Sequence, residues 1–258
     1  MRITTVINQK GGVGKTTTAH ALATGLNHKG YKALVIDTDP QGNITYTMQA
    51  DAAKQGLYEA MRGEIGAAEA IQQTSQGDII PSSLYLAGAD LEFTQTGREY
   101  LLRELLEDIA GAYTHIIIDS PPALGIMTVN ALTASTDIVI PVGADIFSLQ
   151  GLQQLLSTVD KVKKYSNPRL HLAGLLITRR GQRAIATRQL IEAIQARAAA
   201  LHAHLYRATI REAIAIKEAQ IMQGSIFETH AKAKATGDYS AFIDEYLAQE
   251  AQQVRRGE

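Results

Sequence analysis

The feature that most constrains the fold is a glycine-rich stretch near the start of the chain, NQKGGVGKTTT at residues 8–18. It follows an apolar run at residues 3–7 that predicts a buried strand. It precedes residues 19–26, where Leu22 and Leu26 have the spacing of a helix. A strand, a tight glycine turn and a helix together direct backbone N–H groups and a helix N-terminus at phosphate oxygens. The stretch therefore predicts a nucleotide site.

Two side chains of this loop have the chemistry that a nucleoside triphosphate requires. Lys15 is placed to neutralise charge on the β- and γ-phosphates, and the Thr16 hydroxyl is placed to ligate Mg²⁺. The alternative, a flexible glycine loop with two solvated lysines, leaves the coincidence of strand, turn and helix unexplained. We expect the nucleotide to contact Gly11, Gly12, Val13, Gly14, Lys15, Thr16 and Thr17.

Two further apolar runs end in aspartate and predict buried strands. Residues 32–36 lead to Asp37 and Asp39, and residues 115–118 lead to Asp119. Acidic residues just past the carboxyl ends of parallel strands lie where ligands bind. Asp119 has the position of an aspartate that supports Mg²⁺ through a bound water. Asp39 precedes a proline, so an alternative role for it is the N-cap of a helix.

The rest of the chain alternates strand and helix patterns. We expect strands at residues 78–83, 137–142 and 170–178, and a strand followed by a helix within residues 205–220. Amphipathic helices are expected at residues 98–109, 147–165, 184–201 and 238–253. This alternation predicts an α/β fold with a doubly wound, mostly parallel sheet flanked by helices. No linker or internal repeat is visible, so we expect residues 1–258 to form a single domain.

Composition narrows the class of protein. The chain has 45% hydrophobic and 20% charged residues, which is typical of a soluble globular protein. It has no cysteine, which excludes disulfides, thiolate zinc sites and cysteine-ligated iron–sulfur clusters. The seven histidines show no zinc-binding spacing, and we expect them at the surface. The loop begins too early for a signal peptide, and no apolar run reaches about 18 residues, so we expect a cytoplasmic protein.

The net charge of −1 conceals an uneven distribution of charge. Residues 1–150 carry 9 Lys and Arg against 16 Asp and Glu, whereas residues 151–217 carry 12 against 3. A basic block in a nearly neutral chain indicates a surface that faces a polyanion. The alternative is a set of basic helix faces that only keep the protein soluble.

The glycine-rich loop departs from the ordinary pattern, because Gln9 stands where a glycine is usual and Lys10 opens the turn. In this it resembles the deviant phosphate-binding loop of the ParA/MinD family of ATPases. With residues 37–43 and 119–122, the resemblance spans essentially the whole chain and is closest to ParA-type partition ATPases of plasmids, mobile elements or chromosomes.

The resemblance implies ATP and Mg²⁺ as cofactors and ATP hydrolysis as the reaction. It gives catalytic roles to Lys10, Lys15 and Asp39. Lys10 would reach the nucleotide of a partner subunit, and Asp39 would orient the attacking water. Mg²⁺ would be supported by Thr16, Asp39 and Asp119, with Asp37 assisting. The family also places contacts to the adenine base at the end of a late strand, here at Thr178.

The resemblance further implies partners. ATP would close a homodimer, the dimer would bind double-stranded DNA without sequence preference, and a centromere-binding adaptor of the ParB type would stimulate hydrolysis. The protein would then be cytoplasmic and associated with the nucleoid. Our candidates for DNA contacts come from late in the chain: Arg188, Arg211, Lys217, Lys232 and Lys234.

Other functions remain open at this point. A MinD-like ATPase would act at a membrane through a C-terminal amphipathic helix, but residues 248–258 have almost no apolar face. A sibling ATPase would position protein clusters rather than DNA. An amidoligase-like synthetase would need a substrate pocket, for which no motif is evident.

Overall fold

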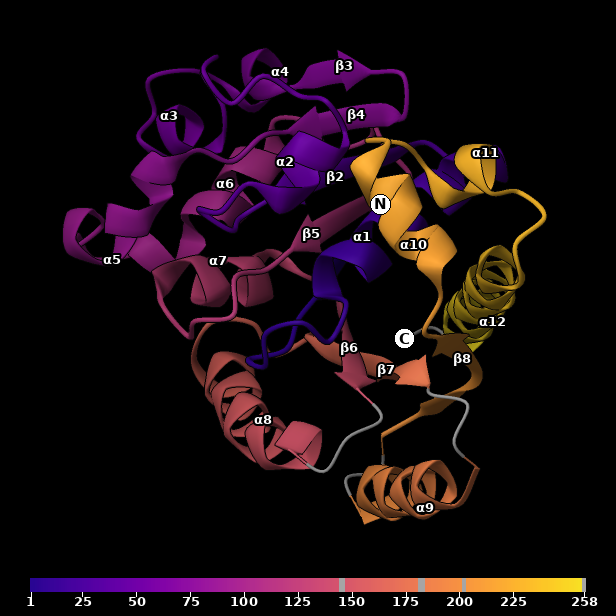
Figure 1. Cartoon of the computed structure of the whole chain (residues 1–258). Helices are drawn as coiled ribbons and strands as arrows, with labels where there is room; N and C mark the ends of the chain where they lie inside the picture. The colour runs from indigo at the N-terminus through magenta and orange to yellow at the C-terminus, as the bar shows by residue number, and fades with distance from the viewer. Residues whose placement is uncertain (144–146, 181–183, 201–202, 257–258) are drawn as a thin grey trace.

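The computed structural model describes residues 1–143, 147–180, 184–200 and 203–256 (Figure 1). Its centre is an eight-stranded sheet with the strand order β3-β4-β2-β5-β1-β6-β7-β8. Neighbouring strands are parallel except β3 and β4, which are antiparallel. The strands are β1 (Arg2–Val6), β2 (Ala33–Asp37), β3 (Gln72–Thr74), β4 (Gly77–Ile80), β5 (His115–Asp119), β6 (Asp137–Gly143), β7 (His171–Arg180) and β8 (Leu205–Arg211).

Helices connect the strands and cover both faces of the sheet. The helices in the first half of the chain are α1 (Lys15–His28), α2 (Asn43–Thr47), α3 (Leu57–Met61), α4 (Ala67–Ala70), η1 (Leu84–Gly88), α5 (Ala89–Glu92), η2 (Arg98–Tyr100) and α6 (Leu101–Glu107). Those in the second half are α7 (Ile126–Ala134), α8 (Phe147–Tyr165), α9 (Ala184–Ala200), α10 (Ile214–Ile221), α11 (Ile226–Thr229) and α12 (Lys234–Arg256).

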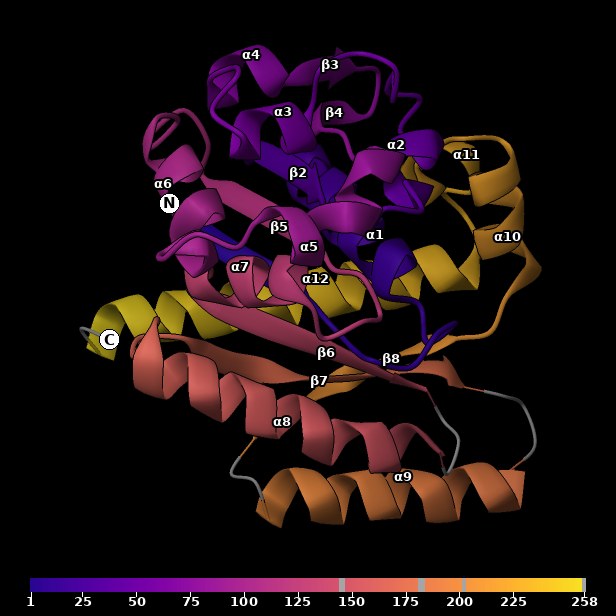
Figure 2. The same ribbon diagram turned by 90° about the vertical axis from the view of Figure 1, so that its left-hand side faces the viewer.

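Alternate residues of the central strands point to opposite faces, so the sheet has an apolar core on each side. On one face, Val6 and Ile117 belong to the core that includes α1, α10, α11 and α12. On the other face, Ile36 and Ile118 pack with α3 to α7, and Ile140 packs with α8 and α9. Figure 2 shows α8 and α9 on the side of the sheet away from α12.

The predicted α/β fold with a doubly wound, mostly parallel sheet is confirmed, and α8 has the predicted bounds. The predicted helix at residues 98–109 is wrong at both ends, because Arg98–Tyr100 is a 3₁₀ turn and α6 ends at Glu107. α12 begins earlier than predicted, at Lys234, where small and polar residues hide the helical period. The short strand β3 was not predicted, because its residues are polar and too few to show alternation.

The sheet edge formed by β8 is covered by two carboxylates of α12. Glu245 accepts hydrogen bonds from the backbone N–H groups of Arg207 at 2.9 Å and Ala208 at 3.1 Å. Asp238 accepts from the Arg211 N–H at 3.1 Å and also from its guanidinium, with Nε–Oδ2 at 2.6 Å and Nη2–Oδ1 at 2.7 Å. An uncovered edge strand is a template for pairing with another chain, so α12 protects this edge from association.

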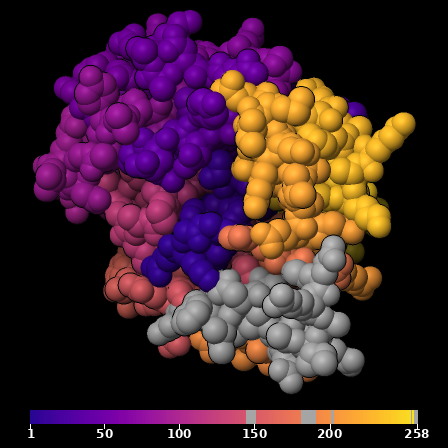
Figure 3. Space-filling view, viewed as in Figure 1, coloured from indigo at the N-terminus to yellow at the C-terminus, as the bar shows by residue number. Residues whose placement is uncertain are grey.

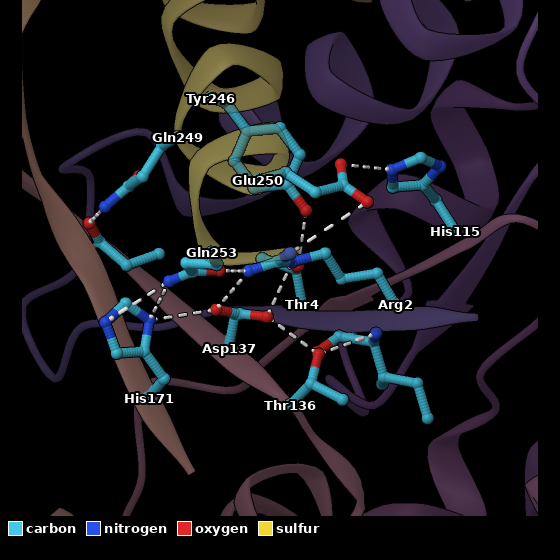
Figure 4. Close-up of polar contacts among 12 residues, drawn as sticks. Arg2, Thr4, His115, Thr136, Asp137, His171, Tyr246, Gln249, Glu250 and Gln253 are labelled. Carbon is cyan, nitrogen blue, oxygen red and sulfur yellow. Dashed lines mark hydrogen bonds and ion pairs between the residues drawn. The ribbon is translucent and has the colours of Figure 1, made fainter. Parts of the chain in front are cut away.

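A polar cluster fastens the amino ends of the central strands to α12 (Figure 4). The Arg2 guanidinium donates to Asp137 on the adjacent strand, with Nε–Oδ2 at 2.8 Å and Nη2–Oδ1 at 3.0 Å. Nδ1 of His171 lies 3.0 Å from Oδ1 of the same carboxylate. At the next position along the edge, Nε2 of His115 lies 3.1 Å from Oε2 of Glu250 in α12. The cluster therefore joins strands β1, β5, β6 and β7 to the last helix.

The expectation that the histidines lie at the surface is wrong for two of them. His115 and His20 are only 2% and 7% exposed. Nε2 of His20 lies 2.8 Å from Oε1 of Gln76, and burial lowers the pKa of His20 to about 4. His20 is therefore neutral at neutral pH. Gln76 and Glu250 lie 56 and 135 residues from these histidines in the sequence, so no local pattern marks the histidines as buried.

The Asp137 carboxylate makes the stability of this cluster depend on pH. Burial would raise the pKa of Asp137, but the hydrogen bonds from His171 and Arg2 outweigh burial and lower the pKa below its usual value. A carboxyl group whose pKa is depressed on folding stabilises the protein above its unfolded pKa of about 3.9. That stabilisation is lost as the pH falls through the folded pKa.

We expect Arg2→Met to lower the free energy of unfolding at pH 7 by about 3 kcal/mol, because it leaves the buried Asp137 carboxylate without its guanidinium. The difference from the unmodified chain should shrink as the pH is lowered below about 4, because Asp137 is then protonated in the unfolded chain and the stabilisation is lost as the pH falls through its lower pKa in the folded, unmodified chain. Urea denaturation between pH 3 and pH 7 measures this difference. A difference that stays constant down to pH 3 would contradict the assigned role of the pair.

Candidate nucleotide site

The glycine-rich loop joins β1 to α1 at the carboxyl edge of the sheet, as predicted, and Lys15 is the first residue of the helix. Gly12 and Gly14 have φ values of 73° and 86°, in the left-handed region that glycine enters without steric cost. Since β1 lies between β5 and β6, the loop stands near the middle of this edge. Figure 1 shows it in indigo on the side of the molecule that faces the viewer.

Side chains from the loop itself and from a later strand hold the loop in shape. Asn8 donates through Nδ2 to the Pro141 carbonyl at 2.7 Å, and its Oδ1 accepts from the Lys10 N–H at 3.0 Å. From the end of β7, the Thr178 hydroxyl donates to the Val13 carbonyl at 2.7 Å. These contacts fix the loop to β6 and β7.

Arg179 also contacts the loop, and the sequence did not predict this contact. Its Nη1 donates to the Gly12 carbonyl at 2.8 Å, and Nη2 lies 3.4 Å from Oε1 of Glu212. Arg179 itself has a φ of 53°, an uncommon conformation for a residue with a side chain. The only signal for it in the sequence was its position at the carboxyl end of a predicted strand.

The Lys15 side chain is folded back into the loop. The residue is 8% exposed, and its Nζ lies 3.5 Å from the Lys10 carbonyl. Burial lowers the pKa of Lys15, while the negative charges of Asp119 and Asp39 act to raise it. A desolvated ammonium of this kind gains more from a bound phosphate than a solvated one would.

Asp37 and Asp39 form the turn that follows β2. Oδ2 of Asp37 accepts from the Thr45 hydroxyl at 2.6 Å and from the Thr45 N–H at 3.1 Å, and Oδ1 accepts from the Asp39 N–H at 3.0 Å. Burial raises the pKa of Asp37 to about 7, against the effect of these hydrogen bonds. Asp39 in turn accepts from the Gln41 N–H at 3.0 Å. Asp37 therefore shapes the turn, and Asp39 is the carboxylate that the turn presents.

The Asp119 carboxylate is the strongest indication of a position that can bind a cation. Within the described part of the chain, neither of its two buried oxygens has a hydrogen-bond partner. Burial raises the pKa of Asp119 well above its usual range and the Asp37 charge adds to this, while the nearby Thr16 hydroxyl and the Lys15 charge oppose it. A buried carboxylate without a partner is costly, so this position fits a hydrated divalent cation.

The donor set fits Mg²⁺ better than a cation held by protein alone. Among the described residues, no three His, Cys, Asp or Glu side chains converge as a metal-binding group. Mg²⁺ commonly binds one or two carboxylates and completes its shell with water and phosphate oxygens. Thr16, Asp39 and Asp119, the residues that the resemblance implies, would hold it in that manner.

A cavity of about 230 Å³ opens beside the loop and has the size for a nucleobase, so we call it the base cavity. Its apolar walls come from Ile210, Ala213 and Ile216, and Thr178 and the loop glycines close it on the other side. Gln220, also in its lining, donates through Nε2 to the Thr17 hydroxyl at 3.0 Å. Thr178 was predicted to contact the base; it lines this cavity, but its hydroxyl is engaged by Val13.

The predicted DNA contacts differ in their surroundings. Lys217, Lys232 and Lys234 are exposed, although Lys217 also lines the base cavity. Arg211 is bound through two guanidinium nitrogens to Asp238, so its charge is already paired. Arg188 lies in α9, and its side chain falls outside the described residues.

Comparison with known proteins agrees with this geometry. Residues 1–172 match the family model described as an AAA domain. The chromosome partitioning protein ParA of Caulobacter vibrioides is 38% identical over 203 residues, which are 76% of each chain. The sporulation initiation inhibitor protein Soj of Bacillus subtilis is 41% identical over 199 residues, which are 75% of this chain and 79% of Soj.

Solved structures extend the similarity to the whole chain. Cobyrinic acid a,c-diamide synthase from Mycobacterium smegmatis with bound ADP and magnesium has a TM-score of 0.85 and 29% identity, covering 100% of this chain and 97% of that one. A putative plasmid partition protein from Borrelia burgdorferi bound to AMPPNP has a TM-score of 0.82 and 26% identity, covering 96% and 99%.

We expect Thr178→Val to weaken nucleotide binding by about fivefold, the equivalent of about 1 kcal/mol. The variant keeps the shape of the side chain but leaves the buried Val13 carbonyl without its donor, which loosens the loop. Calorimetric titration with ADP measures the affinity. The matched control is Thr209→Val on β8, which should bind ADP as the unmodified chain does; equal affinities for all three proteins would contradict the assigned role.

Proposed function

This chain belongs to the ParA/Soj family of partition ATPases, and from that membership we propose that it moves DNA by a cycle of ATP-driven dimerisation, DNA binding and hydrolysis. ATP and Mg²⁺ would occupy the loop of residues 8–18 and the carboxylates beside it. The observation that carries the proposal is the buried Lys15 ammonium facing Asp39 and Asp119 across the carboxyl edge of the sheet.

Each residue of the site has a role in transferring the γ-phosphate to water. When bound, Mg²⁺ supplies positive charge to the phosphates. Lys15 and the loop N–H groups bind and orient the phosphates, while Asp119 and the Thr16 hydroxyl hold the cation side of the site. Asp39, fixed by Asp37 and Gln41, orients the attacking water. Positioning and charge provide most of the catalysis in phosphoryl transfer, and this arrangement supplies both.

The surface around the loop supports a face-to-face homodimer. Large apolar side chains are exposed on two helices beside it: Tyr46 on α2, and Ile214 and Ile221 on α10, with exposures between 64% and 78%. Figure 1 shows α2 and α10 on the same face as the indigo loop, and Figure 3 shows that face with side chains. Exposed apolar residues gathered on one face are typical of a surface that becomes covered. Lys10 opens the loop on this face and would reach the nucleotide of the second copy.

The basic block of residues 151–217, together with Lys232 and Lys234, supports binding to DNA without sequence preference, because phosphate contacts carry no base information. An adaptor of the ParB type would stimulate hydrolysis and release the DNA. In a cell, this binding would place the protein on the nucleoid in the cytoplasm.

The described residues include no helix that is long and apolar enough to cross a membrane.

Synthesis, as in one structural neighbour, has less support than partition. The likeness to cobyrinic acid a,c-diamide synthase extends over the whole chain, but at 29% identity it is weaker in sequence than the 38% and 41% shared with ParA and Soj. We therefore propose partition rather than synthesis.

We expect Lys10→Ala to abolish dimerisation with ATP while nucleotide binding persists, because Lys10 would act only on the partner's nucleotide. Size-exclusion chromatography with light scattering and a non-hydrolysable ATP analogue should give twice the 27.9 kDa monomer mass for the unmodified chain and the monomer mass for the variant. ADP titration is the control for an intact site. A variant that still dimerises fully would contradict the role of Lys10.

We expect the purified protein to bind unrelated DNA duplexes equally, with ATP and not with ADP, and more weakly as salt rises. Replacing Lys232 and Lys234 with alanine should reduce the slope of log affinity against log salt by about 0.9 for each lost phosphate contact. The control is Lys54→Ala, an exposed lysine in the acidic half of the chain. Unchanged binding by the double variant would move the DNA surface away from these lysines.

A further inference from the structure

Two short helices beside the nucleotide site end in the same unusual way and face each other. α2 is followed by Gln49 with a φ of 59°, and α10 is followed by Gln223 with a φ of 48°. Both turns have the backbone hydrogen bonds of a left-handed helix end: Ala50 N–H to Thr45, and Gly224 N–H to Ala219, each at 3.0 Å. Glycine is the usual residue at such a position, because a side chain there is strained.

The glutamine side chains explain why neither position is glycine. Gln223 donates through Nε2 to the Tyr46 carbonyl at 2.9 Å, and Gln49 donates through Nε2 to the Gln223 carbonyl at 3.0 Å. The last carbonyls of a helix have no partner within the helix. Each glutamine side chain therefore binds a carbonyl at the end of the opposite helix, the Tyr46 carbonyl also accepting from the Gln49 N–H at 3.1 Å, and the two helix ends are linked in both directions.

A third glutamine fixes this link to the body of the protein. Nε2 of Gln76 donates to the Gln223 carbonyl at 3.0 Å and to the Thr47 carbonyl at 2.9 Å. Its Oε1 lies 2.8 Å from Nε2 of His20 in α1. We call the set Gln49, Gln76 and Gln223 the glutamine clasp.

The two helices that the clasp joins border opposite sides of the nucleotide site. α10 lines the base cavity through Ile216, Lys217 and Gln220. α2 follows directly on the turn that presents Asp39, and Thr45 of α2 holds the Asp37 carboxylate. No residue of α2 is among the described residues that line the base cavity, so the clasp is a direct connection between these two sides that does not pass through the phosphates.

We propose that the glutamine clasp couples the base cavity to the carboxylate turn, so that a base bound against α10 orders α2 and the residues that precede it. Gln49, Gln76 and Gln223 are then positioning residues, which act on Asp39 through α2. This inference rests on the proposed nucleotide site and adds to it a route by which the two sides respond to each other.

Hydrogen exchange with ADP in the presence of EDTA tests the coupling. Under these conditions ADP reaches the loop and the base cavity, while no metal ion bridges it to the carboxylates. In the unmodified chain, ADP should slow exchange in α1 and α10, and should also slow it at residues 43–50 by about fivefold, the lower end of usual coupling between sites.

The discriminating variants are Gln223→Asn and Gln49→Asn. Asparagine tolerates the left-handed conformation but is one methylene shorter, so each change removes one side-chain hydrogen bond between the helix ends without adding backbone strain. The contacts of Gln76 remain in both variants. At saturating ADP, both variants should keep the protection of α1 and α10 and show less protection of residues 43–50, and the double variant should lose most of it. Gln154→Asn, on the exposed side of α8, is the matched control and should behave as the unmodified chain.

Two outcomes would overturn the coupling. One is protection of residues 43–50 that is undiminished in the double variant, and the other is protection of α1 and α10 in the unmodified chain that never extends to residues 43–50. If ADP protects neither α1 nor α10 in the unmodified chain, the proposed nucleotide site itself fails.

Discussion

The structure depends on a crowding of like charges at one edge of the sheet. The parallel register places Asp37 of β2 directly beside Asp119 of β5, and Asp119 beside the last residue of β1, from which the glycine-rich loop begins. Two fully buried carboxylates at adjacent positions disfavour each other's ionised form, and Lys15 brings only one positive charge. A ligand that adds positive charge here binds the folded chain and not the unfolded one, so it stabilises the fold as it completes the site.

At the opposite edge of the same sheet, a buried carboxylate is paired with several donors and stabilises the fold. Asp137 is also nearly buried, but Arg2, His171 and Thr136 donate to it, and its pKa falls rather than rises. Asp119 lies in the same sheet with no hydrogen-bond partner among the described residues. Asp137 is a carboxylate that stabilises the fold, whereas Asp119 is available to a ligand. Both are buried, and they differ in their hydrogen-bond partners.

The sequence predicted the parts of the site that are local in the chain. The loop, Lys15, Thr16 and the aspartates at strand ends each follow from a short pattern, and the parallel sheet then brings them together. It did not predict the contacts that hold the loop, because Thr178 and Arg179 lie more than 160 residues from the Val13 and Gly12 carbonyls to which they donate. For the same reason it did not show that Asp238 of α12 pairs with Arg211, a predicted DNA contact, and it placed His20 and His115 at the surface.

The fold brings the acidic and the basic parts of the chain together at the proposed nucleotide site. Asp39 and Asp119 come from the acidic first 150 residues, whereas Thr178 and Lys217, which line the base cavity, come from the basic block. A nucleotide in the proposed site therefore contacts both parts of the chain, its phosphates near the carboxylates and its base against α10. Because α10 carries both Lys217 and exposed apolar residues, the surface proposed for partners is continuous with the wall of the base cavity. In the proposed cycle, loss or gain of the nucleotide would act on that surface directly, without a signal passing through the core of the sheet.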